Sequence, residues 1–546
     1  MSKEQFEKIK SIKDIKEIFI NLFPIFFQTK KTINILASCF YRVETKFAKN
    51  KYKQFIQIND DNYPIKGLFG KGLFGIRKGK YKYYFNIYKC SIPKTNLLEY
   101  NPQNLIKACM KSKDEEVVMP TIYNLIHFKK CKGLVSKVYK IPNSDLVCFF
   151  RQAKMNSFAL TVREPNVTDS LKYREMISCA KLLSQLTPKK DIILLYEKEL
   201  DKYEESSSVV YERLIDEGYT NCYYIIKKTS KHNEFIKDKY KKNIIYAYTF
   251  KHFYYFFKCH KFVATETVPH AVELRAANKY ITRKLLKKDY QQVFLQHGVM
   301  YMVALDSAMR GGFRKNGDEL PKFIRIVVSS KLEQQHFVDL GGFNPEELYV
   351  TGLPFYDRTI KNKDADKITI MPTWRSWDYN TLVSNYKDAS YYQFCKSIID
   401  NIPDKYKDKI YLLPHPLILK KFKDTDLNKW IPDIISYDKI LEETNLLITD
   451  YSSISYSAFY RGSNVIFCWE ELDKCMEHYE THLMLNKDNA FGDIAFKNTD
   501  IGKLVEKNYN TPQTKEYIDK YSKIVEFHDG KNTDRVIECL KRDNII

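Results

Sequence analysis

Side chains that can bind phosphate or transfer protons follow five short apolar runs of the sequence. They are His297 and Gly298 after "VFL", Gly352 after "YVT", Thr373 and Arg375 after "ITIM", His415 after "IYLL", and Asp450, Ser452 and Ser453 after "LLIT". Short apolar runs separated by helix-length segments indicate the strands of parallel sheets. Ligands of such sheets bind outside the carboxyl ends of the strands, so these residues predict one shared site.

Each of these side chains has a chemical interpretation and a structural one. His297 can remove a proton from an alcohol, although a histidine at a strand end is often a structural hydrogen-bonding group. His415 lies between two prolines, which aim its imidazole either at a phosphate oxygen or at a neighbouring loop. Arg375 suits a bidentate contact to phosphate, or an ion pair with a local carboxylate. Taken singly, these residues do not decide the chemistry.

Ser452 and Ser453 precede an expected helix, which Gly462 ends before the next strand begins near Val465. Hydroxyls and free N–H groups at a helix N-terminus attract an anion, which makes the serine pair a candidate phosphate seat. Plain helix capping is the alternative, because any serine in this position satisfies it.

The combination of residues narrows these alternatives. Five strand ends with phosphate-compatible or proton-transferring groups are a poor match to chance capping, and none of them carries the HExxH pattern of a metal site. We therefore expect chemistry on a phosphorylated donor that uses neither a metal ion nor a cofactor.

Two series of strands position these residues. The first comprises "DIILLYE", "NCYYIIKK", "NIIYAYT", "KFVATE", "QVFLQHG" and "IRIVVSS". The second begins near residue 345 with "LYVTGLP" and continues through "KITIMPTWR", "KIYLLPHP", "NLLITDYSS" and "NVIFCWEE". Helix-length segments separate the runs, so we predict an α/β fold with two doubly wound units in tandem.

The first 180 residues or so have a different texture and predict a separate, partly β domain, since "YKYYFNIYKCSI" alternates aromatic and polar residues. The apolar stretch at 19–27 is too short to span a bilayer and contains Pro24. We expect a helix packed on its own domain there, with a membrane-interface helix as the alternative. The tail from residue 512 predicts terminal helices with solvated faces.

The composition limits the class of protein. With 546 residues, 44% of them hydrophobic, the chain is long enough for two or three domains with real cores. The 89 Lys and Arg residues exceed the 67 Asp and Glu residues, which favours an anionic partner such as a phosphate-rich substrate, a nucleic acid or an acidic membrane surface. Twelve cysteines without a CxxC pair, and no secretory signal, predict reduced thiols in the cytosol.

With these residues in hand, the second part of the chain resembles the CDP-glycerol glycerophosphotransferase family, the teichoic acid primases and polymerases that transfer glycerol phosphate or ribitol phosphate. The resemblance rests on "QHG" at 296–298, "TGLPFYDR" at 351–358, "IMPTWR" at 370–375, "LLPHP" at 412–416 and "LLITDYSSISYSAFY" at 446–460. These motifs keep the order and approximate spacing of the family.

The resemblance implies a GT-B-like fold, in which two tandem Rossmann-like domains face a cleft. Residues 181–345 are then the first Rossmann-like domain, on the acceptor side and with the catalytic histidine. Residues 346–546 are the second, which binds the CDP-alditol donor and includes the C-terminal helices. Residues 1–180 are an additional N-terminal accessory domain, partly β, without a family motif.

The resemblance also implies roles for individual residues. His297 is the catalytic base. The second histidine, His415, holds the pyrophosphate of the donor together with Ser452 and Ser453. The remaining predicted donor-binding residues are Gly298, Thr373, Arg375 and Asp450, of which Asp450 has ordering its loop as an alternative role. Gln296 stands where the family commonly has tryptophan, a difference that bears on the choice of acceptor.

The implied reaction transfers glycerol phosphate or ribitol phosphate from CDP-glycerol or CDP-ribitol to a hydroxyl of a lipid-linked glycan or polyol-phosphate acceptor, and releases CMP. The product is a polymer of the teichoic acid or capsule type. We expect a cytoplasmic enzyme that works peripherally at the inner face of the cell membrane, where an anionic surface attracts its positive charge.

Two other functions are alternatives to this transfer reaction. A GT-B nucleotide-sugar glycosyltransferase of surface polysaccharide synthesis would share the fold, but "PTWR" and "TDYSS" argue against it. A nucleic-acid-binding protein would suit the basic charge, yet the chain lacks short motifs for that function and its lysines are spread throughout. We therefore expect no nucleic-acid partner.

Overall fold

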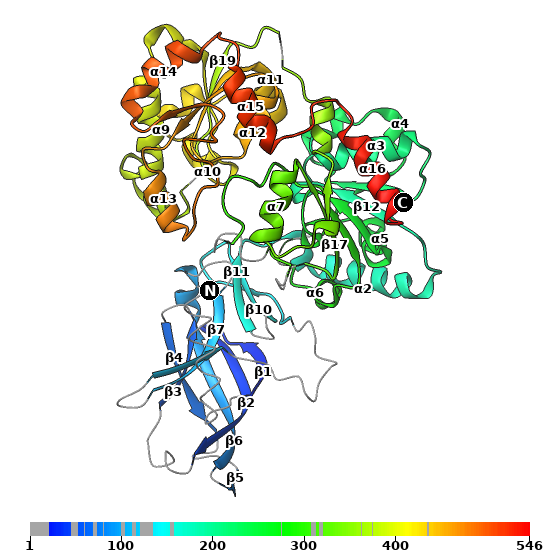
Figure 1. The fold of residues 1–546 in the computed structure, drawn as a ribbon. Helices are drawn as coiled ribbons and strands as arrows, with labels where there is room; N and C mark the ends of the chain where they lie inside the picture. Colours follow the sequence, from blue (N-terminus) through cyan, green and yellow to red (C-terminus); the bar gives the residue numbers. More distant parts are fainter. Residues whose placement is uncertain are drawn as a thin grey trace. The chain divides into compact units, whose positions relative to one another are not determined.

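The computed structural model of the protein describes residues 21–44, 53–58, 61–68, 74–79, 81–99, 104–111, 116–120, 135–152, 158–272, 274, 276–306, 313–315, 320–361, 363–373, 375–433 and 436–546. The chain forms two compact units (Figure 1). One unit comprises residues 1–187 and 272–288, and the other comprises residues 188–271 and 289–546.

The first unit contains an eleven-stranded sheet. Its strands are β1 (Asn21–Gln28), β2 (Thr32–Glu44), β3 (Lys53–Ile58), β4 (Asp61–Gly67), β5 (Phe74–Lys78), β6 (Tyr81–Pro93), β7 (Asn104–Lys111), β8 (Glu116–Pro120), β9 (Tyr139–Lys140), β10 (Val147–Gln152) and β11 (Phe158–Arg163). All pairs are antiparallel, in the order β1-β2-β6-β4-β3-β7-β11-β10-β9. Two helices, α2 (Leu171–Leu186) and α6 (Lys279–Lys287), contact each other in the same unit.

The predicted N-terminal helix was wrong over the described residues, because 21–28 form strand β1. All eight residues pair with β2, in register from Asn21 opposite Phe40 to Gln28 opposite Ile33. Pro24 explains the outcome, since proline removes a helix hydrogen bond but is tolerated in a strand at the edge of a sheet, where β1 lies. Residues 1–20 lie outside the described part of the chain.

The second unit contains a seven-stranded parallel sheet. Its strands in spatial order are β14 (Ile244–Tyr246), β13 (Cys222–Ile226), β12 (Ile193–Tyr196), β15 (Lys261–Ala264), β16 (Gln291–Phe294), β17 (Phe323–Val328) and β18 (Leu348–Val350). Its helices are α3 (Ser206–Asp216), α4 (Asp238–Lys241), α5 (Phe250–Lys258) and α7 (Lys331–Asp339). The order along the sheet reverses between β12 and β15, and ligands of doubly wound sheets bind outside such a reversal.

Both faces of this sheet are buried, which is why its strands are nearly continuous apolar runs. Val293 belongs to the same core as Val210 of α3, whereas its neighbour Phe294 belongs to a second core with Phe337 of α7. Successive side chains of a strand point to opposite faces, so α3 and α7 cover opposite faces of the sheet.

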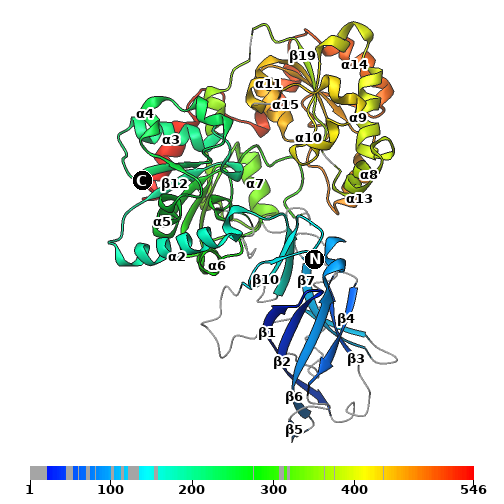
Figure 2. The ribbon, with the colours of Figure 1, turned by 180° about the vertical axis from the view of Figure 1, so that it is seen from behind.

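The same unit contains a five-stranded parallel sheet, visible from behind in Figure 2. Its strands in spatial order are β20 (Ile410–Leu412), β19 (Lys367–Ile370), β21 (Thr444–Thr449), β22 (Asn464–Cys468) and β23 (Asp493–Ala495). The helices around it are α8 (Tyr379–Ser384), α9 (Ser390–Asn401), α10 (Pro416–Phe422), α11 (Tyr437–Glu443), α12 (Ile454–Tyr460), α13 (Leu472–His478) and α14 (Ile501–Asn508). The strand order of this sheet reverses between β19 and β21.

The predicted α/β class with parallel sheets is confirmed, but one strand was assigned to the wrong series. The run "LYVTGLP" was expected to begin the second sheet, whereas β18 pairs with β17 at the edge of the first. A buried apolar run predicts a strand but does not say which neighbour it pairs with, and no local pattern distinguishes the two sheets.

The chain ends in α15 (Lys515–Ile524) and α16 (Asn532–Arg542). The last helix contacts α3 of the first parallel sheet and buries Val536, Ile537 and Leu540. In the described part of the chain, every helix is too short or too polar to cross a membrane.

Candidate active site

The predicted base and a carboxylate lie at the carboxyl ends of neighbouring strands of the first sheet. His297 follows β16 and its side chain is 50% exposed, while Glu266 follows β15 and its side chain is 12% exposed. His297 Nδ1 is 3.9 Å from Glu266 Oε1. Because β15 and β16 are paired in register, the two side chains emerge beside each other at the same edge of the sheet.

The loop that carries His297 is tightly held. Gln296 has a φ of +57°, a conformation that costs a non-glycine residue about 1–3 kcal/mol and persists only where its surroundings impose it. Its Nε2 donates to the carbonyl of Val327, at 2.6 Å. On the other side of the histidine, Met300 N donates to the buried carboxylate of Glu333, at 2.7 Å. The backbone on both sides of His297 is therefore anchored.

At Gly298, the loop after strand β16 of the first sheet approaches the loop after strand β21 of the second sheet. A Cβ atom at this position would lie 3.5 Å from Ser453 Oγ, so the loop after β16 lies in van der Waals reach of the serine pair after β21. Two hydrogen bonds fix the segment that follows, residues 301–302. Tyr456 OH of α12 donates to the carbonyl of Tyr301, and Met484 N donates to the carbonyl of Met302, at 2.9 Å. The loop that carries the predicted base His297 therefore lies next to Ser453 of the predicted phosphate seat.

The serine pair precedes α12, but neither hydroxyl caps the helix strongly. Ser453 makes no side-chain cap hydrogen bond, and Ser452 Oγ accepts only a long one from Ile454 N, at 3.5 Å. Gly462, with a φ of +91°, follows the helix. Both serine side chains are partly exposed, so their hydroxyls are accessible to a ligand.

Arg375 and Asp450 form a buried ion pair where the order of the second sheet reverses. Their side chains are 1% and 2% exposed, and Arg375 Nη1 lies 2.8 Å from Asp450 Oδ2. Asp450 Oδ1 accepts a hydrogen bond from Thr373 N, at 2.9 Å. Arg375 Nη1 also donates to the Tyr451 hydroxyl, at 2.9 Å. The pair therefore ties the loop after β19 to the loop after β21.

His415 follows β20, and its carbonyl accepts hydrogen bonds from the first turn of α10. Burial, and secondarily the positive charge of Lys198, lower the pKa of His415 to about 4. The imidazole is therefore neutral at pH 7 and can offer one N–H and one acceptor nitrogen.

Gly352 does not join these residues. It has a φ of +76° and lies against Asn532, the first residue of α16. This glycine is required by the packing of the C-terminal helix.

Two charged residues of the site were missed in the sequence. Glu266 ends the run "KFVATE", and Lys198 follows "DIILLY", so both lie directly after strands that the apolar pattern predicts. Burial raises the pKa of Glu266 to about 7, with a further increase from Glu205, whereas the positive charge of Lys198 opposes the shift. Lys198 is exposed, and its positive charge lowers the pKa of both Glu266 and His415. Asking which polar residues follow every strand, including β12 and β15, would have found them.

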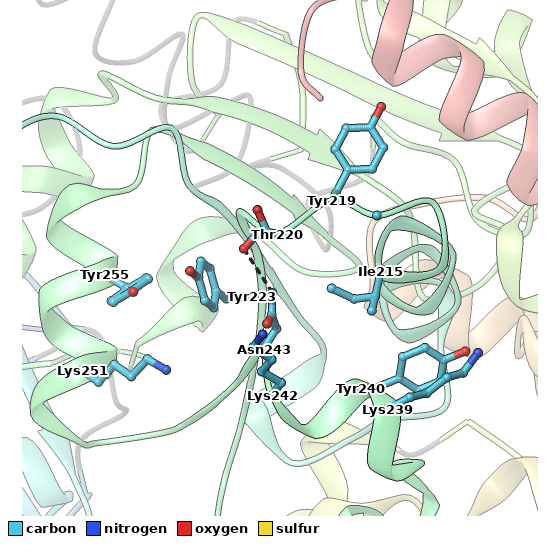
Figure 3. A pocket seen from close by; sticks show the side chains of 11 residues that line it. Ile215, Tyr219, Thr220, Tyr223, Lys239, Tyr240, Lys242, Asn243, Lys251 and Tyr255 are labelled. Atoms are coloured by element: carbon cyan, nitrogen blue, oxygen red, sulfur yellow. Dashed lines mark hydrogen bonds between the residues drawn. The ribbon is translucent and has the colours of Figure 1, made fainter.

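Within the described residues, no group of three His, Cys, Asp or Glu side chains could hold a metal ion. A cavity of about 390 Å³ lies elsewhere on the first sheet, near the amino-terminal ends of β13 and β14 (Figure 3). It is lined by Thr220, Tyr223 and Asn243 among others. His297 follows the carboxyl end of β16 and therefore lies at the opposite edge of this parallel sheet.

Comparison with known proteins supports the same group of motifs. A family model described as CDP-Glycerol:Poly(glycerophosphate) glycerophosphotransferase matches residues 179–541. The minor teichoic acid biosynthesis protein GgaB of Bacillus subtilis (strain 168) is 26% identical over 376 residues, 63% of this chain and 39% of GgaB. The teichoic acid poly(ribitol-phosphate) polymerase of Bacillus spizizenii is 23% identical over 255 residues, 42% of this chain and 39% of that polymerase. The match thus spans 39% of the length of each of these relatives.

Solved structures give a weaker likeness. The wall teichoic acid polymerase TagF is 16% identical, with a TM-score of 0.48 over 68% of this chain and 96% of that chain. The UDP-GlcNAc 2-epimerase of Methanocaldococcus jannaschii is 12% identical, with a TM-score of 0.37 over 64% of this chain and 99% of that chain.

Proposed function

Because the chain belongs to the CDP-glycerol:poly(glycerophosphate) glycerophosphotransferase family, we propose that it transfers glycerol phosphate or ribitol phosphate from a CDP-alditol to an acceptor hydroxyl and releases CMP. The observation that carries this proposal is the approach of Gly298, the residue after the candidate base, to Ser453 Oγ of the candidate phosphate seat. The matched region, residues 179–541, includes both of these loops.

The proposed architecture is GT-B-like, with two Rossmann-like domains facing a cleft and an N-terminal accessory domain. The strand order of each parallel sheet supports it, since each reverses once and carries candidate site residues beside the reversal. The proposed division is 1–180, 181–345 and 346–546. β18 pairs in the first parallel sheet and α16 contacts α3, so residues beyond 345 also contribute to the first sheet and its cover.

In the proposed reaction, the acceptor oxygen bonds to the alditol-bearing phosphorus while the bond from that phosphorus to the CMP oxygen breaks. His297 takes the proton of the acceptor hydroxyl as the new bond forms, and CMP leaves with the electron pair of the broken bond. A general base contributes about 100-fold to 10,000-fold to such a step. The half-exposed imidazole of His297 is accessible to the acceptor, and its anchored backbone limits the positions it adopts.

Most of the remaining barrier is the negative charge on the phosphoryl oxygens and on the departing CMP, which placed donors stabilise. Ser452 and Ser453 offer hydroxyls, and His415 offers a neutral N–H donor because its pKa is lowered to about 4. Lys198 adds a positive charge close to His415, on the exposed loop after β12.

Arg375 and Asp450 act on the donor indirectly in this proposal. A guanidinium that is 1% exposed and bonded to a carboxylate has little capacity left for a phosphate. We assign the pair to holding Thr373 and the start of the serine loop in position. An ion pair with a local carboxylate was the alternative role that the sequence indicated for Arg375, and the observed pair with Asp450 is buried.

The proposed acceptor is a lipid-linked glycan or polyol phosphate, and the proposed location is the cytoplasm at the inner face of the membrane. The net charge of +22 supports attachment to an anionic surface, because juxtamembrane Lys and Arg residues each contribute about 1 kcal/mol to such binding. Two relatives, the minor teichoic acid biosynthesis protein GgaB and the poly(ribitol-phosphate) polymerase, support a teichoic acid product.

The test is the release of CMP from CDP-glycerol and, separately, from CDP-ribitol, by the wild type and His297→Ala with a lipid-linked glycan acceptor. We expect turnover of one donor and a loss of about 100-fold or more in the variant. The exposed His260→Ala serves as a matched histidine control. Turnover of a nucleotide sugar in place of both CDP-alditols would refute the proposed function.

A further inference from the structure

We propose that Glu266 is the positioning residue of the candidate base: its carboxylate orients His297 and stabilises the imidazolium that forms when the acceptor proton is taken. This inference deepens the proposed function and rests on it. His297 Nδ1 lies within ion-pair distance of Glu266 Oε1, at 3.9 Å.

The geometry leaves the other ring nitrogen for the substrate. With Nδ1 toward Glu266, Nε2 of His297 points away from the carboxylate and is the atom that would take the acceptor proton. The distance of 3.9 Å between His297 Nδ1 and Glu266 Oε1 is longer than a hydrogen bond. Hydrogen bonds between catalytic groups often shorten when the substrate binds. The side chain of His297 is half-exposed, so a small rotation closes this distance.

The backbone beneath Glu266 is built rigidly. Its carbonyl accepts hydrogen bonds from the hydroxyl of Tyr196, at 3.1 Å, and from Nε2 of Gln292, at 3.4 Å. The preceding Thr265 donates through N to Ser207 Oγ, at 2.9 Å. Hydrogen bonds from three different segments therefore fix this strand end, which is what a residue that must aim a base requires.

Several charged groups face Glu266 from the elements around it. They are Lys198 and Glu199 on the loop after β12, Lys202 and Glu205 before α3, His270 on the following turn, and His297 after β16. The glutamates disfavour a negative charge on Glu266 and the two lysines favour it. His270 Nε2 lies 3.6 Å from the second oxygen, Oε2, so the carboxylate is held between two imidazoles.

Glu205 is the nearest competitor for this role, but it is engaged elsewhere. It accepts a hydrogen bond from Thr265 Oγ1, at 2.7 Å, and forms an ion pair with Lys202, at 3.2 Å. Its charge also acts on His297. Because Glu205 is already held by Thr265 and Lys202, we assign the pairing with the imidazolium to Glu266, which lies 3.9 Å from His297 Nδ1.

The test compares Glu266→Gln and Glu266→Asp with the wild type. Glu266→Gln keeps the size of the side chain and removes the charge, so we expect kcat to fall about 10-fold to 100-fold, less than the loss of the general base itself, while KM for the CDP-alditol changes less than 3-fold. Glu266→Asp restores a carboxylate and is expected to recover part of the loss. The exposed Glu234→Gln removes a carboxylate elsewhere in the same unit and is the matched control.

The pH profile separates this role from a structural one. In the wild type, both an ionised Glu266 and an unprotonated His297 are needed, so log kcat on the acid side should approach a slope of 2. With Glu266→Gln the slope should fall to 1, because only the histidine still titrates. Full activity of Glu266→Gln with an unchanged slope would overturn the inference. Absence of turnover by the wild type would instead refute the proposed function.

A second inference rests on the cavity near the amino-terminal ends of β13 and β14. We propose that it binds a segment of an anionic, hydroxyl-rich chain, chemically a polyol phosphate. Three lysines and four tyrosines line the cavity, and one of these lysines, Lys239, pairs with Asp216 at 2.7 Å. Figure 3 shows Lys251 beside Tyr223 and Tyr255 on one side of Asn243, with Lys239 and Tyr240 on the other.

The chemistry of the lining selects this class of ligand. Lys251 lies over the rings of Tyr223 and Tyr255, 5.7 Å from each centroid, so its ammonium is held at the wall of the cavity. The two rings meet edge to face at 4.7 Å. Lysine ammonium groups suit phosphate, while tyrosine hydroxyls and the Asn243 amide suit the hydroxyls of a polyol.

The probe is a glycerol phosphate oligomer added without any CDP donor, and the readout is hydrogen-exchange protection along the full chain. We expect protection of residues 215–223 and 239–255 in the wild type, and its loss in the double variant Lys242→Ala, Lys251→Ala. Lys241→Ala is the control, because that exposed lysine pairs with Asp238 and does not line the cavity. Protection confined to the loops at 296–300 and 450–456, or none at all, would refute this second inference whatever the transfer assay shows.

Discussion

At the scale of single residues, this site separates groups that face a ligand from groups that hold those groups in place. His297, Ser452 and Ser453 are partly or fully exposed, whereas Arg375 and Asp450 are buried against each other. The two classes call for different experiments, since a buried ion pair affects folding and an exposed donor affects binding.

Arg375→Ala is expected to lower the free energy of unfolding by about 3–5 kcal/mol, because it leaves the Asp450 carboxylate buried without its partner. The double variant Arg375→Met, Asp450→Leu removes both charges and should lose less. Urea unfolding measures both. A single variant with normal stability and a raised KM for the donor would show instead that Arg375 contacts the donor.

His415→Ala is expected to reduce kcat/KM by about 10-fold, by the same factor at pH 6 and at pH 8. The reason is that its pKa is lowered to about 4, so the imidazole is already neutral at both pH values and acts only as a hydrogen-bond donor. Initial rates of CMP release over this range measure the effect. If the loss were much larger at pH 6 than at pH 8, His415 would be acting as a cation.

At the scale of elements, the site depends on which strand ends lie side by side. The loop after β16 meets Glu266 because β15 and β16 pair, and it meets Ser453 because α12 and the segment near Met484 hold residues 301–302. The C-terminal helix α16 also contacts the first sheet. Asn532 Nδ2 donates to the carbonyl of Leu353, just after β18, at 3.2 Å.

Gly352→Ala is expected to destabilise the protein by about 2–4 kcal/mol, because a Cβ there would overlap Asn532 and the φ of +76° adds strain. Gly218→Ala is the matched control. Its φ is +89°, but nothing lies within 4 Å of the added Cβ, so only the backbone cost of about 1–2 kcal/mol applies. Urea unfolding compares the two, and equal losses would show that α16 yields without cost.

At the scale of the whole molecule, the net charge of +22 and the family membership both support the proposal of an anionic substrate. The family match covers residues 179–541, which include both parallel sheets of the second unit. The antiparallel sheet of the first unit lies outside that match, whereas α6 and the second half of α2 lie inside it.

The full chain is expected to bind vesicles that contain anionic lipid and to dissociate as salt is raised from 50 to 500 mM, because electrostatic attraction is screened. Its net charge of +22 is the reason for this expectation. Co-sedimentation with vesicles of phosphatidylglycerol and phosphatidylcholine, against phosphatidylcholine alone, measures it. Equal binding to both kinds of vesicle would argue against an electrostatic attachment.

The amino-acid sequence alone determined the α/β class and most strands of the two parallel sheets. Buried parallel strands are short apolar runs, and the polar residue that ends each run is readable in the sequence. For the same reason, the sequence predicted His297, His415 and the serine pair as site residues, and the order of their motifs indicated the family.

Tertiary structure alone decided the rest, because pairing between distant strands is not written in local patterns. It placed β18 in the first sheet, turned 21–28 into an edge strand, and buried Arg375 against Asp450. It also placed Glu266 beside His297, two residues 31 positions apart whose strands happen to be neighbours. A carboxylate after a strand has no chemical meaning in the sequence until the structure shows which side chain it faces.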